Sequence, residues 1–278
     1  MQAVEYLLNL KHSLPALSYA MLTQYLSSFY SISPSWTKAH LLSALTGENI
    51  DSRNAFWCGF LTRAQISYEL MPELQSTLYE LAVGSDFKTG GFERNICALI
   101  LLDWEESQQK NCVSDSNLKL RELLLQAGEY HAIVFLRTIE SWCNDDDRKS
   151  TWLPLSITFL NKVWPRQKCM RTPKISAQLF ELIFSSKILF DNLHRIVIPK
   201  LSTVERGNSL YINRREPEKE IIRDRPFDAL QVFHRILPAD AHSWPYDIGS
   251  IIQDLLDSDE GIKHKSEMIE LKRRWDSL

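Results

Sequence analysis

Apolar residues recur at every third or fourth position along most of this chain, and that spacing constrains the fold more than any other feature. In residues 67–83, "SYELMPELQSTLYELAV", it predicts one continuous apolar stripe on a helix, with the acidic side chains turned away. Residues 92–106, "FERNICALILLDWEE", are apolar around most of a helix, so we expect a central, covered helix. The stripe in residues 67–83 consists of Leu70, Met71, Leu74, Leu78, Leu81 and Ala82.

Helix ends are also marked in the sequence. Residues 114–128 close on a glycine, and the helical pattern of residues 129–142 begins at once, which predicts an antiparallel helix pair with a tight turn. Thr172 followed by Pro173 provides a capping side chain and then a proline at the first helical position. The chain has only 9 glycines and 11 prolines, fewer than the turns of a sheet-rich protein of this size would need.

The helix pairs recur at a spacing of about 40 residues, which is within the range of helical solenoid repeats. One helix pair cannot bury its apolar face alone, so consecutive pairs stack and cover one another. We therefore predict an all-α protein, an irregular HEAT-like solenoid of stacked antiparallel helix pairs. We expect the solenoid to span residues 1–201 and a C-terminal helical cap to span residues 226–278.

Residues 202–225 break this pattern, and we expect them to form a charged connecting loop between the solenoid and the cap. The cations there could clamp a phosphate or an acidic partner surface. The acids between them favour a solvated, internally paired loop instead. The chain's only weak candidate for a strand, "SLYIN" at residues 209–213, also lies here. The candidate partner-binding residues are Arg214, Arg215, Lys219, Arg223 and Arg225.

The charge balance bears on the class of partner. The formal net charge is −3 and the sequence pI is about 6.2, whereas proteins that mainly bind nucleic acid usually carry a net positive charge or a strongly basic face. The longest apolar run, Ile96–Leu102, is far shorter than the ~20 residues that cross a bilayer. The first residues also lack the basic region and the cleavage site of a signal peptide. We expect a cytoplasmic protein that binds neither nucleic acid nor a membrane.

The cysteines and histidines do not form a recognisable metal or disulfide pattern. The cysteines are odd in number and widely spaced, with no CxxC pair, so we expect reduced and mostly buried thiols. His131 and His194 fall on apolar helices, and we interpret both as partly buried structural histidines. The cysteines are Cys58, Cys97, Cys112, Cys143 and Cys169.

Fragments of a serine acyl-enzyme pattern occur but do not assemble. "SWTK" at residues 35–38, "KTG" at 88–90 and "SDSN" at 114–117 are similar to motifs of penicillin-binding enzymes. Their order is wrong, no strand is predicted to hold KTG, and SxxK occurs a second time at residues 116–119. The acidic run Asp145–Asp147 is typical of a solvated turn. We therefore expect no catalytic, cofactor-binding or metal-binding residues.

Residues 235–249, "RILPADAHSWPYDIG", look at first like an active site, because a histidine lies between two acids. Each residue nevertheless has a structural explanation. Pro238 ends the preceding helix, Ser243 is expected to cap the next one, and Trp244 is expected to pack on its apolar positions as a hydrophobic staple. No nucleophile and orienting acid are fixed near His242, so we interpret the stretch as a corner between two helices.

Three short segments carry a resemblance to a known family. They are "VWPRQKCMRTPKISAQLFELI" from Val163, "LPADAHSWPYDIGSIIQDLLD" from Leu237, and the closing "ELKRRW". These segments resemble the C-terminal helical region of large bacterial proteins that carry a sirtuin-like, NAD-consuming domain at the N-terminus and are associated with anti-phage defence. The resemblance covers mainly residues 150–278 and implies the non-catalytic part of such a protein: a sensor, a regulator or an assembly surface. The sequence contains no sirtuin-type nucleotide motif, so the resemblance assigns no site residue here.

We therefore expect a non-catalytic helical binding or regulatory module, the C-terminal region of a larger bacterial anti-phage defence effector. Its partner would be another protein or a linked effector domain, recognised on a helical surface. One alternative is a stand-alone helical enzyme, which requires polar side chains that converge in a deep groove. Another is a nucleic-acid-binding helical-repeat protein of the DNA glycosylase type, which requires a basic concave face.

Overall fold

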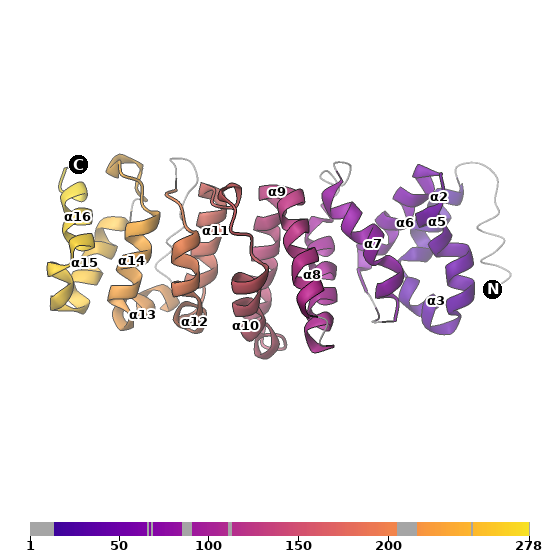
Figure 1. Cartoon of the computed structure of the whole chain (residues 1–278), viewed down its shortest axis with the longest axis horizontal. Helices are drawn as coiled ribbons and strands as arrows, with labels where there is room; N and C mark the ends of the chain where they lie inside the picture. The colour runs from indigo at the N-terminus through magenta and orange to yellow at the C-terminus, as the bar shows by residue number, and fades with distance from the viewer. Residues whose placement is uncertain are drawn as a thin grey trace. The chain divides into compact units, whose positions relative to one another are not determined.

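The chain is all-α and divides into two compact units, Met1–Ser116 and Asn117–Leu278. In the residues that the structure describes, every regular element is a helix and no strand occurs, which confirms the predicted fold class. The boundary between the units lies in the first turn of helix α9 (Val113–Cys143). The computed structural model of the chain (Figure 1) describes residues 14–65, 67, 69–84, 91–110, 113–204, 216–245 and 247–277.

The first unit is built from short helices before residue 47 and longer ones after it. Helix α2 packs on α6, α5 packs on α6, and α7 packs on α8. The helices of this unit are α2 (Leu14–Thr23), α3 (Leu26–Ile32), α4 (Pro34–Thr37), the π-helical turn η1 (Lys38–Leu42), α5 (Ser43–Thr46), α6 (Ile50–Arg63), α7 (Met71–Val83) and α8 (Glu93–Gln109).

The contact between α2 and α6 depends on a glycine. A Cβ atom at Gly59 of α6 would overlap the Ala20 carbonyl and the Thr23 hydroxyl of α2, so a residue without a side chain lets the two backbones approach. The Thr23 hydroxyl is fully buried and lies 2.8 Å from the Tyr19 carbonyl oxygen and 3.0 Å from that of Phe56. It donates its one hydrogen between these acceptors and so joins α2 to α6 by a polar contact inside an apolar interface.

Helix α7 carries the apolar stripe that its sequence predicts, and it packs on α8 with this face. Leu81 is only half-buried. The buried Asp103 of α8 accepts hydrogen bonds from Gln75 (2.8 Å) and the Tyr79 hydroxyl (3.3 Å), which adds a polar link between the helices. Burial and the Asp103 charge raise the pKa of Tyr79, so its hydroxyl keeps its proton. The buried stripe consists of Leu70, Met71, Leu74, Leu78 and Ala82.

In the second unit, helices that follow one another in the chain pack against each other. Helix α11 contacts α12, α12 contacts α13, α13 contacts α14 and α15, and α14 contacts α16. Phenylalanine rings from α11, α12 and α14 meet in the core of this stack. Its elements are α10 (Lys149–Thr158), η3 (Phe159–Val163), η4 (Lys168–Met170), α11 (Pro173–Phe184), α12 (Lys187–Val197), η5 (Ile198–Lys200), α13 (Glu216–Asp224), α14 (Pro226–Ile236), η6 (Ala241–Ser243), α15 (Ile248–Ser258), η7 (Glu260–His264) and α16 (Ser266–Trp275).

Most of the predicted helix ends are found in the structure. Gly128, with φ of +77°, interrupts α9 where the sequence predicts a turn. The Thr172 hydroxyl accepts from the Ile175 amide (3.3 Å), and a proline follows Thr172 at the first position of α11. On α12, Ile188 is 57% exposed, while Phe190 is buried.

At the corner between α14 and α15 Trp244 is buried, whereas the cap differs from the prediction and packing of Trp244 on the apolar positions of α15 stays a prediction. Trp244 is buried, its indole N–H donates to the Pro238 carbonyl (2.7 Å), and its ring stacks on Trp275 of α16. The prediction that Ser243 caps the following helix is wrong, because α15 begins only at residue 248. The capping side chain is Asp240, which accepts from the His242 amide (3.0 Å) and starts the short helix η6.

The charged segment differs most from the prediction. The expected connecting loop over residues 202–225 is wrong for residues 216–224, which form α13 and bury Ile221 and Ile222. Glutamate, lysine and arginine favour helices, and two adjacent isoleucines suffice to anchor a helix this short on its neighbours. The weak strand candidate at residues 209–213 lies outside the described residues. The HEAT-like solenoid and the boundaries at residues 201 and 226 stay predictions.

Replacing Gly59 by alanine tests the close approach of α2 and α6. The new methyl group would overlap backbone atoms of α2, and overpacking of this kind costs about 1–3 kcal/mol, which outweighs alanine's better helix propensity of about 1 kcal/mol. We expect Gly59→Ala to lower the urea midpoint measured by circular dichroism. Gly84→Ala is the matched control, because a Cβ there makes only ordinary contacts and the backbone φ is −65°. Equal stability of both variants would contradict the packing argument.

Replacing Trp244 by alanine tests the corner between α14 and α15. Truncation of a large buried aromatic side chain costs about 3–5 kcal/mol, and here it also removes the hydrogen bond to Pro238 and the contact with Trp275. Chemical denaturation followed by circular dichroism measures the loss. The exposed neighbour His242 provides the control, since His242→Ala should change the stability by less than about 0.5 kcal/mol. A loss below about 1 kcal/mol for Trp244→Ala would show that this corner contributes no packing energy.

Candidate binding surface

The candidate partner-binding residues are only partly in view. Arg214 and Arg215 lie outside the described residues. Lys219 and Arg223 lie on α13, and Arg225 immediately precedes α14. The structure therefore replaces part of the expected charged loop by a charged helix followed directly by the next helix.

Helix α13 has two distinct faces. Its inner face buries Ile221 and Ile222 against the neighbouring helices. Its outer stripe has the spacing i, i+3, i+4, i+7 and is entirely charged, with two acids and two cations in alternation. The outer stripe consists of Glu216, Lys219, Glu220 and Arg223.

Each described cation of the candidate set is paired with a carboxylate. The Lys219 ammonium lies 3.1 Å from Glu216, and the Arg223 guanidinium lies 2.9 Å from Asp224; both pairs are internal to α13. Arg225 reaches a different helix, because its Nε donates to Asp191 of α12 at 2.8 Å. The structure thus confirms the ion pairing that the alternating charges predict, and it shows that one pair joins two helices.

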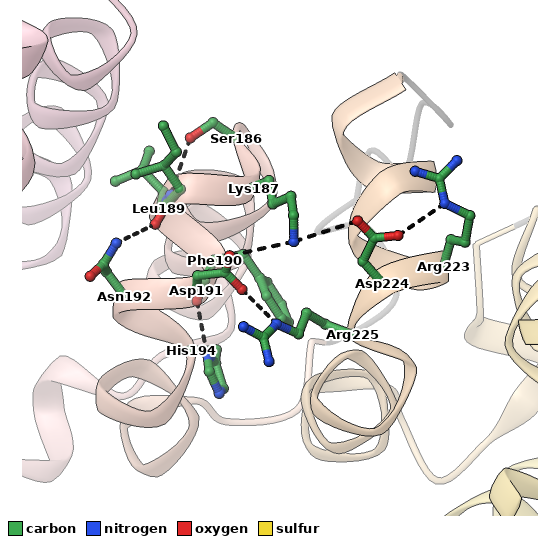
Figure 2. Close-up of polar contacts among 11 residues, drawn as sticks. Ser186, Lys187, Leu189, Phe190, Asp191, Asn192, His194, Arg223, Asp224 and Arg225 are labelled. Carbon is green, nitrogen blue, oxygen red and sulfur yellow. Dashed lines mark hydrogen bonds and ion pairs between the residues drawn. The ribbon is translucent and has the colours of Figure 1, made fainter. Parts of the chain in front are cut away.

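A lysine that the sequence interpretation did not include connects these pairs. The Lys187 ammonium lies 3.4 Å from Asp191 and 3.6 Å from Asp224, so it bridges α12 and α13 (Figure 2). Figure 2 shows the chain of contacts from Arg223 through Asp224, Lys187 and Asp191 to Arg225. The i, i+4 spacing of Lys187 and Asp191 was a local signal for one link, but pairing across helices leaves no mark in the sequence.

The charges of this network shift one another's pKa values in the direction that favours the charged forms of the paired groups. The hydrogen bond from Arg223, followed by the charges of Arg223 and Lys187, lowers the pKa of Asp224. The same pair raises the pKa of Arg223. Asp224 therefore stays ionised through neutral pH. Its contribution to stability is lost only as the pH falls through its lowered pKa.

A groove of about 730 Å³ lies between α13 and α15. One wall is the charged outer stripe of α13, and the other is a polar stripe of α15 with the spacing i, i+3, i+4. Ile222 contributes an apolar part of the lining. The α15 residues in this wall are Asp254, Asp257 and Ser258.

The described lining of the groove is mostly charged. Among the described residues that line it, the one hydroxyl group, that of Ser258, donates to the Asp254 carbonyl (2.6 Å), and none is a histidine or a cysteine. In the part of the chain that the structure describes, no group of three His, Cys, Asp or Glu residues could hold a metal ion. An ensemble of alternating charges can discriminate between partner surfaces, but it does not provide an activated nucleophile.

The histidines occupy structural positions. His131 and His194 are buried, and the Nδ1 atom of each lies within hydrogen-bond distance of the carbonyl one helical turn earlier, at Ala127 (3.3 Å) and Phe190 (2.7 Å). The His194 ring also stacks on Phe190. Both follow the structural interpretation made from the sequence. His242 is exposed at the corner before α15.

Comparisons with protein-family models, with curated proteins and with solved structures found no match to this chain. Among its described helices, none has both the length and the apolar character needed to cross a membrane.

Removal of one carboxylate tests whether the network joins α12 to the following helices. Asp191→Asn breaks the contacts with both Arg225 and Lys187, and partly exposed pairs of this kind contribute about 0.2–1 kcal/mol each. We expect a small loss of stability in low salt that shrinks in concentrated salt, measured by urea denaturation. Asp146→Asn removes a pair within a solvent-exposed turn and should leave the stability unchanged. A salt-independent loss for Asp191→Asn would mean that the effect is steric.

Proposed function

We propose that this protein is a non-catalytic helical module that binds a protein partner through the charged surface of α13 and the groove beside it. The observation that carries the proposal is the pair of polar helix stripes that line one groove, from α13 and α15. Charged side chains that face a partner across a groove can steer its approach and favour one partner surface over another.

The arrangement favours a helical partner segment. A groove between two helices accepts a third helix, and side chains one turn apart on the partner would meet the stripes at matching intervals. Alternating acids and cations on the walls attract a partner with the opposite pattern and repel one with the same pattern. The ion pairs of Arg225 and Lys187 hold these side chains between helices before a partner binds. This lowers the conformational entropy that binding would cost.

We further propose that the module belongs to a larger bacterial anti-phage defence effector. This part of the proposal rests on the resemblance of residues 150–278 to the C-terminal helical region of proteins with a sirtuin-like domain. In such an arrangement the module would sense, regulate or assemble, and NAD consumption would belong to a separate domain or chain. An NAD-consuming domain encoded in frame with this sequence, or in an adjacent gene, supports the proposal; neighbouring genes unrelated to defence contradict it.

Charge reversal on α13 tests the binding surface. Lys219→Glu/Arg223→Glu inverts both cations of the outer stripe without touching the buried isoleucines. Affinity-tagged protein would be recovered from bacteria with and without phage infection, and retained proteins would be quantified by mass spectrometry. We expect a defined protein to be retained by the unmodified chain and reduced about tenfold or more by the double variant.

The matched control is Lys272→Glu/Arg273→Glu, which reverses two exposed cations on α16 of the same unit. Circular dichroism checks that both double variants keep their helical content. If the control variant retains the partner and the α13 variant loses it, the surface is assigned. Identical retention by all three proteins, or no specific protein retained by any, would overturn the proposal.

A further inference from the structure

The distribution of charge along the chain is strongly uneven. From residue 148 to residue 180 the sequence contains seven lysines and arginines and not a single aspartate or glutamate. The whole chain nevertheless has a formal net charge of −3. An acid-free stretch in an acidic protein concentrates positive potential on the surface that it forms. The seven cations are Arg148, Lys149, Lys162, Arg166, Lys168, Arg171 and Lys174.

Three of these cations have partners. Lys149 pairs with Asp146, Lys174 lies 3.7 Å from Glu129, and the Arg148 guanidinium lies over the Trp142 ring. The other four are exposed, and none forms an ion pair with any residue that the structure describes. They are Lys162, Arg166, Lys168 and Arg171, at the end of η3 and on the connector that leads to α11.

The packing of the second unit adds a fifth cation to this connector. The Ser202 amide donates to the Ser176 hydroxyl (2.8 Å), which holds the segment after η5 against the first turn of α11. Lys200, the last residue of η5, is half-buried, and its ammonium donates to the Ile196 carbonyl (3.0 Å). No ion pair to Lys200 occurs among the described residues.

The two arginines of the connector act on Lys200. Burial, and then the charges of Arg166 and Arg171, lower the pKa of the Lys200 ammonium. Both arginines therefore lie near enough to Lys200 for their charges to act on its ammonium. Like charges that no described carboxylate neutralises are suited to an anion site, in which the ligand supplies the missing negative charge.

We propose that Arg166, Arg171 and Lys200 bind the phosphate group of a small phosphorylated ligand. Two guanidinium groups provide forked donors that match phosphate oxygens, and the lysine provides a point charge held in place by the Ile196 carbonyl. Lys168 and Lys162 enlarge the positive field around the site. This inference does not depend on the α13 surface, since the two share no residue.

The surroundings favour a small phosphate over a nucleic acid. Proteins that hold single strands combine basic grooves with aromatic side chains on which the bases stack. Among the described residues from 148 to 204, the one large apolar side chain that is exposed is Ile188, and no exposed aromatic ring accompanies the arginines. The described residues around the cluster thus offer charge and hydrogen-bond donors to a phosphate but no row of exposed aromatic rings on which the bases of a strand could stack.

Isothermal titration calorimetry with inorganic phosphate and pyrophosphate tests the proposal on the full chain, against potassium chloride of equal ionic strength. We expect saturable binding at one site. Arg166→Gln/Arg171→Gln should weaken it about tenfold or more, because each lost guanidinium removes charge-assisted hydrogen bonds. Lys272→Gln/Arg273→Gln removes two exposed cations elsewhere in the unit and should bind as the unmodified protein does.

A second measurement separates binding from folding. Because the arginines repel Lys200, Arg166→Gln/Arg171→Gln should have a ligand-free melting temperature equal to or above that of the unmodified protein, while its pyrophosphate-induced shift disappears. A variant that is destabilised without ligand would indicate a structural role and contradict the proposal.

Further probes identify the source of the phosphate. Tighter binding of ADP than of pyrophosphate indicates a nucleotide, and equal or weaker binding indicates a free phosphate or diphosphate; both support the site. Saturable binding of a thymidine oligonucleotide alone would assign the patch to nucleic acid and overturn the proposal. The proposal would also be overturned if neither phosphate probe bound, or if the double variant bound them as tightly as the unmodified protein. None of these results decides whether the α13 surface binds a protein partner, because the retention experiment tests that proposal separately.

Discussion

The burial of apolar helix faces against one another is the constraint from which the other features of this protein follow. Helices of 10 to 17 residues, such as α2 and α8, gain most of their stability from packing rather than from intrinsic propensity. Where two helices come closest, the contact depends on a missing side chain, as at Gly59 against α2 and at Gly249 against Trp275. Two of the buried polar side chains between packed helices, Thr23 and Asp103, are hydrogen-bonded across the contact.

Because the apolar residues are committed to these contacts, the charged residues are left on the outer stripes, where they occur in two arrangements. On α12 and α13 acids and cations alternate, so the charges pair and fix neighbouring helices to each other. Around Lys200 no carboxylate among the described residues forms an ion pair with the cations, so their charges are not neutralised there. The proposed partner surface is thus a paired, patterned face, whereas the proposed phosphate site is a cluster of cations without described ion pairs.

The sequence predicted those features that depend on residues close together in the chain. The stripe of α7, the break at Gly128 and the Thr172 cap are local patterns of three to five residues, and the structure contains all three. The sequence-based prediction was wrong where two local signals competed. The high charge of residues 216–224 indicated a loop, but buried isoleucines and helix-favouring charged residues produce α13 instead.

The two candidate sites could not be found from local patterns, because each is formed by residues from several helices. Lys187 becomes a bridge only when α12 packs on α13. The acid-free stretch from residue 148 to residue 180 was visible in the sequence, but a run of cations on separate elements can equally be dispersed over a surface. What distinguishes a site is convergence: the Ser176–Ser202 contact holds the segment after Lys200 against α11, and the charges of Arg166 and Arg171 act on Lys200. A half-buried lysine beside two arginines costs stability, and proteins commonly retain such a cost where a function depends on it.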